Sequence, residues 1–453
     1  MKIVKRGVVP VYTSIDLFSG PGGLATGFLW SNIKPLIAVE ISDWTCETYS
    51  KTHNADILVL KDYNNSPDAF NHIFQPNNKT VLIKGDITEV SNELIIKILK
   101  ERFNTNTVDV VTGGAPCESF SMAGQRREKD ERDNLFLNIL RVSRAIKSRM
   151  ILFENVKGLF SKKAEGIKGK IYKNICNEFS TKQNGVSYRL VETEPNKVLL
   201  KASDYGVPQN RERIFLIGIR EDLDLKFNYP EPVTNYISVE DAIVDLPQLK
   251  AGEESNTYTG KELNEYQKIM RGLDTRFPIP KHLNFIYDAT TSLTSHKAVN
   301  HREKMIKRMS LIKTGESMKS AAERLEREGK CDLRAKLFPK KLYGARNRRL
   351  KLDIPSFTVT SHCLDEMVHP IEDRGLTPRE VARLQSFPDW YLFEGPFVKF
   401  HSDPEQDRYE QIGDAIPPLL AYAIGKQIFK SLIDFDSKLI EQPTNEELVI
   451  NPL

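Results

Sequence analysis

The sequence predicts an α/β protein with an open, mostly parallel, doubly wound β-sheet and a smaller inserted domain. Short apolar runs of strand length alternate with helical patterns over residues 12–153. Several of these runs end in glycines or in an acidic residue, which is typical of the edge of a parallel sheet where ligands bind. A strongly basic stretch, residues 261–351, separates them from the C-terminal helices. This stretch predicts the inserted domain.

The composition is that of an ordinary globular protein. The chain has 453 residues, 40% hydrophobic and 28% charged, which is enough for two domains or for one large domain with an insertion. No apolar run approaches the roughly 20 residues that span a bilayer, and the N-terminus has no signal-peptide pattern. We therefore expect a soluble, cytoplasmic protein with no membrane partner. The five cysteines are scattered and never in C-x-x-C spacing, so neither disulfides nor a zinc site is predicted.

Positive charge is concentrated in the basic stretch. Residues 261–351 contain 23 Lys and Arg against 10 Asp and Glu, a net charge of +13, whereas the whole chain carries +4 and the remainder therefore −9. A single charge run is usually a solvated face, but an excess of this size favours a segment that binds a polyanion, with nucleic acid as the partner. Tyr343 and Asn347 are interspersed among these cations, a pattern suited to phosphate contacts and to some base reading.

A glycine-rich turn, S-G-P-G-G at residues 19–23, follows the first predicted strand at residues 12–18. A helix is predicted directly after it, at residues 24–30. The glycines let a ligand approach the backbone, and the start of the helix offers free N–H groups. The turn therefore indicates a nucleotide-type site, although alone it is a weak signal.

Two acidic residues follow the next predicted strands. Glu40 ends the strand at residues 34–39, about twenty residues after the turn, where an acid commonly binds ribose hydroxyls. Asp86 follows the strand at residues 80–84. Either acid alone is as often a plain surface residue, but their joint placement at one sheet edge favours a binding site. Residues 51–79, rich in Asn, Asp and Pro, show no strong periodicity and receive no assigned function.

Cys117 follows a short apolar run and the sequence G-G-A-P. This pattern predicts a buried strand at residues 108–111 and a loop that leaves the sheet. The thiol then lies at the carboxyl edge of the sheet, where it is a candidate nucleophile. A buried structural cysteine is the commoner role of such a residue taken in isolation.

Polar side chains also accompany the next two apolar strands. Glu154 and Asn155 end the strand at residues 150–153, so Glu154 is well placed as an acid or hydrogen-bond partner to a bound ring. Arg211 and Arg213 alternate just before a later strand and therefore project to the same side of an extended segment. Salt-bridge partners within the fold are the alternative role for both arginines.

Two helices are predicted near the C-terminus. The first, at residues 376–387, begins with the capping sequence T-P-R-E. The second, at residues 419–433, carries an apolar face that is expected to pack back on the sheet. That return makes the first domain discontinuous.

In this order the motifs resemble those of the DNA (cytosine-5) methyltransferases. They cover both ends and the middle of the chain, and the basic stretch corresponds to the variable target-recognition domain of that family. The matching motifs are DLFSGPGG (16–23), VE (39–40), GDI (85–87), GGAPCESFS (113–121), FENV (153–156), QNRER (209–213), LTPREVARLQSFP (376–388) and GDAIPP (413–418).

The resemblance implies the fold of S-adenosylmethionine-dependent methyltransferases. Residues 1–228 plus 401–453 would form the catalytic, cofactor-binding domain, and residues 229–400 the target-recognition domain and a return helix. The implied reaction is sequence-specific transfer of a methyl group from S-adenosyl-L-methionine to C5 of a cytosine flipped out of double-stranded DNA, in restriction-modification. A companion restriction endonuclease acting on the same site is an implied partner, and a monomer is expected.

The resemblance also implies roles for individual residues. Cys117 would be the nucleophile that adds to C6, Glu154 the partner of the cytosine edge and Arg213 an orienting cation, with Asn155 and Arg211 beside them. No metal site is implied. The residues implied for the cofactor pocket are Phe18, Gly20, Gly22, Glu40, Ile41, Asp86, Ile87, Pro116 and Asp414.

Four positions differ from the usual family pattern. Ala115 stands where a second proline is usual, and Glu118 where glutamine is usual. Asp414 replaces the usual asparagine near the cofactor, and Ile41 stands where an aromatic ring often stacks on adenine.

Two other functions stay open. The first is an RNA cytosine-5 methyltransferase of the same fold, against which the large basic stretch and the absence of a Cys-Phe-Thr sequence argue. The second is a catalytically silent DNA-binding regulator, against which the presence of Cys117, Glu154 and Arg213 argues.

Overall fold

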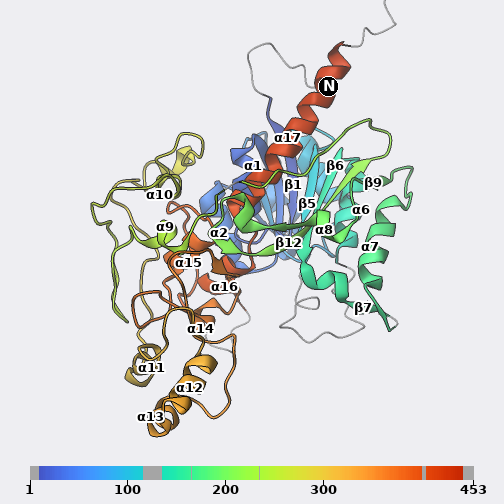
Figure 1. The fold of residues 1–453 in the computed structure, drawn as a ribbon. Helices are drawn as coiled ribbons and strands as arrows, with labels where there is room; N and C mark the ends of the chain where they lie inside the picture. Colours follow the sequence, from blue (N-terminus) through green and yellow to red (C-terminus); the bar gives the residue numbers. More distant parts are fainter. Residues whose placement is uncertain (1–9, 116–134, 165, 234, 400–404, 442–453) are drawn as a thin grey trace, which may run out of the picture.

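The computed structural model describes residues 10–115, 135–164, 166–233, 235–399 and 405–441 (Figure 1). Pro116, Cys117 and Glu118 therefore lie outside the described residues. Within the described part of the chain, no helix combines the length and the apolar character needed to cross a membrane.

A nine-stranded sheet forms the centre of the molecule, in the order β10-β12-β6-β5-β1-β2-β4-β3 with β9 beside β12. Strands β6, β5, β1, β2, β4 and β3, in this order across the sheet, are parallel, whereas β12 runs antiparallel to β6, β9 and β10. The strands are β1 (Tyr12–Leu17), β2 (Ile33–Glu40), β3 (Asp56–Val59), β4 (Val81–Lys84), β5 (Val110–Gly113), β6 (Met150–Val156), β9 (Tyr188–Leu190), β10 (Leu199–Lys201) and β12 (Glu212–Arg220).

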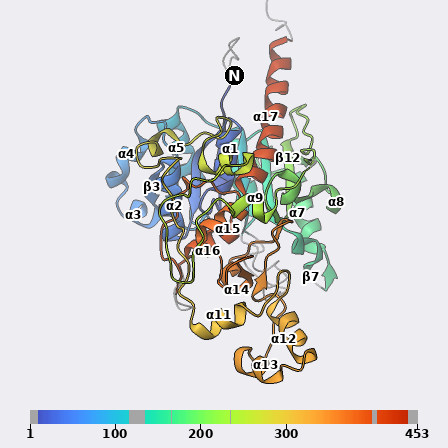
Figure 2. The same ribbon diagram turned by 60° about the vertical axis from the view of Figure 1, so that its left-hand side comes forward.

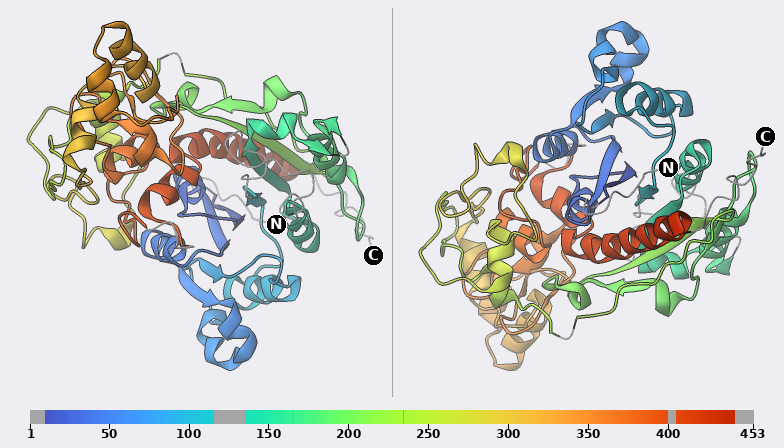
Figure 3. Two further views of the ribbon diagram at one scale, coloured as in Figure 1. Left: turned by 90° about the horizontal axis from the view of Figure 1, so that it is seen from below. Right: turned by 90° about the horizontal axis from the view of Figure 1, so that it is seen from above.

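Helices cover both faces of this sheet, as the near-continuous apolar character of its strands requires (Figures 1 and 3). Successive side chains of β6 alternate between the two faces: Leu152 packs with the core that contains α1 and α17, and Phe153 with the core that contains α5, α6 and α7. The doubly wound α/β fold is confirmed. These helices, with α2, are α1 (Gly23–Trp30), α2 (Asp43–His53), α5 (Asn92–Phe103), α6 (Leu137–Ile146), α7 (Lys170–Ser180) and α17 (Pro418–Glu441).

Smaller elements connect the strands. Residues 51–79 contain β3 as well as short helices, which their sequence did not predict. The elements are α3 (Leu60–Asn65), η1 (Pro67–Phe70), α4 (Asn71–Phe74), η3 (Lys157–Ser161), β7 (Lys163–Ala164), β8 (Ile167–Lys168), α8 (Pro195–Val198), η4 (Ala202–Tyr205) and β11 (Gln209–Asn210).

The region after the sheet divides into two parts by its packing. Helices α9, α10, α15 and α16 contribute to the same hydrophobic core as α1 and α17, whereas α12 and α13 enclose a separate small core around Leu325. Helices α11 to α13 project as a lobe below the sheet domain (Figures 1 and 2). The predicted domain boundaries at residues 229 and 400 stay a prediction. The elements are α9 (Val239–Ile243), α10 (Glu265–Arg271), η5 (Lys281–Leu283), α11 (Glu303–Met309), α12 (Met318–Arg327), α13 (Cys331–Leu337), β13 (Arg348–Arg349), β14 (Ser356–Phe357), α14 (Cys363–Glu366), β15 (Met367–Val368), α15 (Pro378–Leu384) and α16 (Arg408–Asp414).

Helix α15 begins with the capping box that its sequence predicts. The Thr377 hydroxyl accepts a hydrogen bond from the Glu380 backbone N–H at 3.1 Å, and the Glu380 carboxylate accepts one from the Thr377 N–H at 2.8 Å. The helix ends at Leu384, earlier than predicted, and Ser386 then adopts a positive φ of 60°.

Candidate active site

The glycine-rich turn between β1 and α1 is held closely by its surroundings. Phe18, Gly20 and Gly22 have positive φ values of 58°, 55° and 100°. A Cβ at Gly22 would lie 2.3 Å from Nε2 of His53 and 2.9 Å from the hydroxyl of Tyr391. A side chain is thus excluded at Gly22 both by conformation and by space. The start of α1 follows at once, so backbone N–H groups face the same edge of the sheet.

Glu40 fastens this turn to the end of β2. Its Oε2 accepts a hydrogen bond from the Gly20 N–H at 2.9 Å, and its Oε1 accepts bonds from Ile41 N–H at 2.8 Å and Ser42 N–H at 3.0 Å. Burial raises the pKa of the Glu40 carboxyl, and these N–H donors oppose that shift. Because each carboxylate oxygen has two lone pairs, Oε2 can still accept one further donor from a ligand.

Asp16 is a residue that the sequence analysis missed. It lies in β1, only 2% exposed, and its Oδ1 accepts a hydrogen bond from the Thr112 hydroxyl at 2.7 Å. Its Oδ2 is buried and has no hydrogen-bond partner among the described residues. Burial raises the pKa of Asp16 to about 7. The signal in the sequence was an aspartate inside an otherwise apolar strand, two residues before Phe18.

The other predicted cofactor residues lie around the same edge. Asp86 follows β4 and accepts bonds from the Thr88 N–H and hydroxyl, both at 2.8 Å, and Ile87 is buried. Ile41 is 64% exposed and offers an apolar surface beside Glu40. Asp414 is exposed at the end of α16, where its Oδ2 accepts a hydrogen bond from the Gln406 side chain at 2.9 Å.

Gln406 connects Asp414 to the helix that follows Glu40. Its Oε1 accepts a hydrogen bond from the Thr45 hydroxyl of α2 at 2.8 Å. Next to it, Glu405 accepts bonds from the Ser42 hydroxyl at 2.9 Å and the Asp43 N–H at 2.8 Å. The segment before α16 is therefore joined to the start of α2.

Glu154 and Arg213 form a largely buried ion pair across β6 and β12. Nε of Arg213 lies 2.9 Å from Oε1 of Glu154, and the side chains are 13% and 12% exposed. Burial raises the pKa of Glu154, whereas the positive charges of Arg213 and Arg211 lower it. The other carboxylate oxygen, Oε2, would lie 2.7 Å from a Cβ at Gly114. Glycine at the end of β5 thus leaves room for this carboxylate.

Asn155 and Arg211 hold the segments beside this pair. Asn155 is 1% exposed, and its side-chain amide donates a hydrogen bond to the Ala115 carbonyl at 3.3 Å. Arg211 is also 1% exposed, and its Nη1 donates to the Val359 carbonyl at 2.7 Å. Asn155 therefore fixes the last described residue before Pro116 and Cys117, and Arg211 fixes the extended segment that follows β14.

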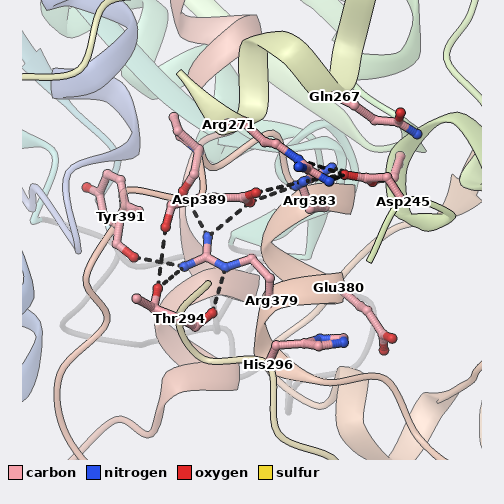
Figure 4. Close-up of polar contacts among 12 residues, drawn as sticks. Asp245, Gln267, Arg271, Thr294, His296, Arg379, Glu380, Arg383, Asp389 and Tyr391 are labelled. Atoms are coloured by element: carbon pink, nitrogen blue, oxygen red, sulfur yellow. Dashed lines mark hydrogen bonds and ion pairs between the residues drawn. The ribbon is translucent and has the colours of Figure 1, made fainter. Parts of the chain in front are cut away.

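A buried ion-pair network joins α15 to the segment from α9 to α10 (Figure 4). Arg383 pairs with Asp389 at 2.6 Å and with Asp245 at 3.1 Å, and Arg271 pairs with Asp245 at 2.7 Å. Arg379 donates to the Thr294 hydroxyl at 2.7 Å and its carbonyl at 2.9 Å. Within the described ranges, no group of three or more His, Cys, Asp or Glu side chains is arranged to hold a metal ion.

The sheet order, the glycine turn after its first strand and the acids at the ends of later strands define the α/β fold of the S-adenosylmethionine-dependent methyltransferases. A solved structure supports this fold. It is a prophage-encoded E. coli protein described as a DNA modification methyltransferase, with a TM-score of 0.65 and 23% identity over 94% of this chain and 99% of that chain.

Sequence comparison then identifies the family. The model for C-5 cytosine-specific DNA methylases matches residues 12–70 and 64–430. The type II methyltransferase M.DdeI of Desulfomicrobium norvegicum is 31% identical over 91% of this chain and 88% of its own length. M1.HphI of Haemophilus parahaemolyticus is 31% identical over 92% and 87%. The chain belongs to the C-5 cytosine-specific DNA methylase family and is a DNA (cytosine-5) methyltransferase.

Proposed function

We propose that the chain methylates C5 of a cytosine within a specific sequence of double-stranded DNA, through a covalent bond between Cys117 and C6 of the flipped base. The observation that carries this proposal is the position of the Glu154 carboxyl, which Arg213 holds beside Gly114. Gly114 directly follows β5 and stands three residues before Cys117 in the sequence. A carboxyl with a raised pKa in this position suits a partner for the ring nitrogen of the base.

The residues at the sheet edge fit S-adenosyl-L-methionine. The space beside Gly20 is open, since a Cβ there would meet nothing within 4 Å, so a ligand can approach the backbone of the turn at this point. Glu40 has acceptor capacity for ribose hydroxyls. The buried Oδ2 of Asp16, to which no described residue donates a hydrogen bond, suits an ammonium group. Ile41, Asp86, Ile87 and the exposed Asp414 would line the remainder, with Phe18, Gly20 and Pro116. When bound, the cofactor supplies a methyl group made electrophilic by its sulfonium sulfur.

Cys117 would supply the electrons for the reaction. C5 of cytosine is a poor nucleophile, and addition of the Cys117 thiolate to C6 pushes electron density to C5. Glu154, protonated or sharing a proton with N3, stabilises this adduct, and Arg213 holds the carboxyl in place. After C5 has received the methyl group, loss of the C5 proton and β-elimination of the thiolate restore the ring and free Cys117.

The thiolate form of Cys117 requires nearby positive charge. A free thiol has a pKa of roughly 8.5, and adjacent arginines lower it. Arg211 and Arg213 already act on the pKa of Glu154, so they are the candidate sources of this potential.

The duplex must open for this chemistry. A stacked cytosine is out of reach of any side chain, and flipping it out costs a few kcal/mol. Phosphate contacts from the exposed cations of the lobe α11 to α13 offset this cost. Residues 229–400 would thus form the target-recognition domain, and residues 1–228 plus 401–453 the catalytic domain.

The names of the relatives support a place in restriction-modification, because M.DdeI and M1.HphI are both called type II methyltransferases. A monomeric enzyme and a companion endonuclease that cuts the same site are parts of this proposal.

The test is to incubate the protein with labelled S-adenosyl-L-methionine and either duplex DNA or tRNA, side by side. Label in DNA, mapped to cytosine C5 by bisulfite sequencing, supports the proposal. Label in tRNA alone, or in neither, contradicts it.

A further inference from the structure

The exposed turn Tyr343–Arg346, in the loop between α13 and β13, carries an arginine that only weak, exposed contacts hold in place. Most of the described arginines in residues 229–400 are instead held by several strong contacts within the protein. Arg349 donates to the carbonyls of Ile312, His369 and Met309 and pairs with Asp373. Arg271 is buried against Asp245, and Arg324 pairs with Glu316 at 2.8 Å. These arginines hold the protein together, so they are poor candidates for contact with DNA.

The turn differs because its side chains point to solvent. The Arg346 N–H donates to the Tyr343 carbonyl at 3.2 Å, which closes the turn, and the Tyr343 side chain is 45% exposed. The Arg346 guanidinium lies 5.6 Å from the centre of the Tyr343 ring, and Lys341 Nζ lies 5.1 Å from it. The ring thus orients two cations. The ion pair of Arg346 with Asp365 is long, 3.7 Å, and both side chains are more than half exposed, so it is easily exchanged for another partner.

The base of the turn is rigid. Asn347 is 5% exposed, and both its backbone N–H and its side-chain amide donate to the Asp365 carbonyl, at 2.9 and 3.0 Å. Asn347 is therefore committed to α14 and cannot read a base. The Arg346 carbonyl accepts a bond from the Met318 N–H at the start of α12. A turn fixed on both sides presents its side chains at little entropic cost.

The turn is also connected to the candidate active site. Arg348 stacks on Phe357 with its guanidinium carbon 3.3 Å from the ring centre. Phe357 belongs to β14, which pairs with β11, and β11 leads directly to Arg211 and Arg213. In Figures 1 and 2, α14, to which the turn is bonded, lies between the lobe and the remainder of the protein. The turn therefore belongs to the part of the chain that connects the lobe with the candidate active site.

We propose that Arg346 is a specificity-determining residue that contacts a guanine edge in the major groove, and that Tyr343 positions it. The fork of an arginine matches the O6 and N7 acceptors of guanine. This inference rests on the proposed function, since it needs a DNA substrate. A contact of Arg346 with phosphate is the competing outcome.

The test begins with the recognition sequence, read by bisulfite sequencing of DNA from cells that express the protein. kcat/KM is then measured on that duplex and on each duplex with one base pair changed, at several salt concentrations. Arg346→Ala and Arg346→Lys should both lower discrimination at one G·C pair by about tenfold or more, because lysine lacks the fork. Tyr343→Phe should behave as wild type, whereas Tyr343→Ala should relax the same position. Lys340→Ala, an exposed cation of the same loop, should weaken all duplexes equally and reduce the salt slope by about 1.

Two results would overturn the inference while the proposed function stands. One is that Arg346→Ala weakens all duplexes equally and reduces the salt slope, as a phosphate contact does. The other is that both Arg346 variants keep wild-type discrimination. If the wild-type protein methylates no duplex at all, the proposed function fails and this inference fails with it.

Discussion

Nε of Arg213 lies 2.9 Å from Oε1 of Glu154, in a pair that joins β12 to β6 where each side chain is about one-eighth exposed. Burial raises the pKa of the Glu154 carboxyl, and the arginine limits that rise. The pair therefore sets both the orientation of the carboxyl and the pH at which it loses its proton.

Replacing Arg213 should move the pH profile of the enzyme upward. Without the positive charge, the ionised form of Glu154 is less stable, so its pKa rises further and the protonated form persists to higher pH. We expect Arg213→Ala to lower kcat by about 10²-fold, because the carboxyl loses its orientation, and to shift the alkaline limb of kcat to higher pH. Arg213→Lys should shift this limb less. A downward shift in Arg213→Ala would contradict the pairing.

Gly114→Ala should impair catalysis more than folding. The new Cβ would lie 2.7 Å from Oε2 of Glu154, so the carboxylate must move away from its place beside Arg213. We expect a loss in kcat of about 10²-fold with a small change in the midpoint of urea unfolding. Gly260 is the matched control, because a Cβ there meets nothing within 4 Å. Equal activity of the Gly114→Ala and Gly260→Ala proteins would show that this carboxylate position does not matter.

Asp16→Asn should stabilise the ligand-free protein at neutral and alkaline pH but not at acidic pH. The pKa of Asp16 is about 7 in the folded protein, against the usual 3.8. Between these pH values the unfolded state ionises and the folded state does not, so the wild type loses stability as the pH rises. Below about pH 4 the two proteins should be equally stable. Above about pH 7 the asparagine variant should gain up to about 4 kcal/mol. Thermal unfolding across this pH range measures the difference, and a gain that is constant with pH would refute the raised pKa.

Arg383→Met should strongly destabilise the fold. The substitution leaves Asp245 and Asp389 with less compensation in a buried site, where loss of one partner costs about 3–5 kcal/mol. The pair of the exposed Arg276 with Asp274 provides the control, and Arg276→Met should cost about 1 kcal/mol or less. Urea unfolding of both variants measures the two losses in the free energy of unfolding. A similar small loss in both would mean that the network contributes specificity of packing rather than stability.

The parts of the fold that the sequence predicted have strong local patterns. The first strand, the glycine turn and α1 follow one another within nineteen residues of Tyr12 and need no distant contact to be recognised. The capping box at Thr377 is similarly local. By contrast, β3 is a mostly apolar run of only four residues within an otherwise polar stretch, too short to predict from sequence alone, and its pairing with β4 stabilises it.

The candidate site was predictable where each residue ends a strand, and not where its partner comes from elsewhere. Glu154 and Arg213 were both expected near the reacting ring, but their ion pair depends on the antiparallel pairing of β6 with β12. Asn347 was expected beside DNA and is instead buried against α14. The residues just before it in the sequence are exposed, and only the tertiary contact with α14 distinguishes it from them, so the sequence pattern could not predict its burial. The helix pattern of residues 376–387 also gave no sign that Arg379 and Arg383 of α15 are fully buried.

The most direct test of the account is the covalent bond between Cys117 and the target base. A duplex that carries 5-fluorocytosine at the methylated position should trap the enzyme, because fluorine at C5 blocks the loss that must precede release of the thiolate. We predict a denaturant-resistant adduct with the wild-type protein in the presence of S-adenosyl-L-methionine, and none with Cys117→Ser. Absence of an adduct with a wild-type enzyme that methylates ordinary DNA, or unchanged methylation by Cys117→Ser, would contradict the account.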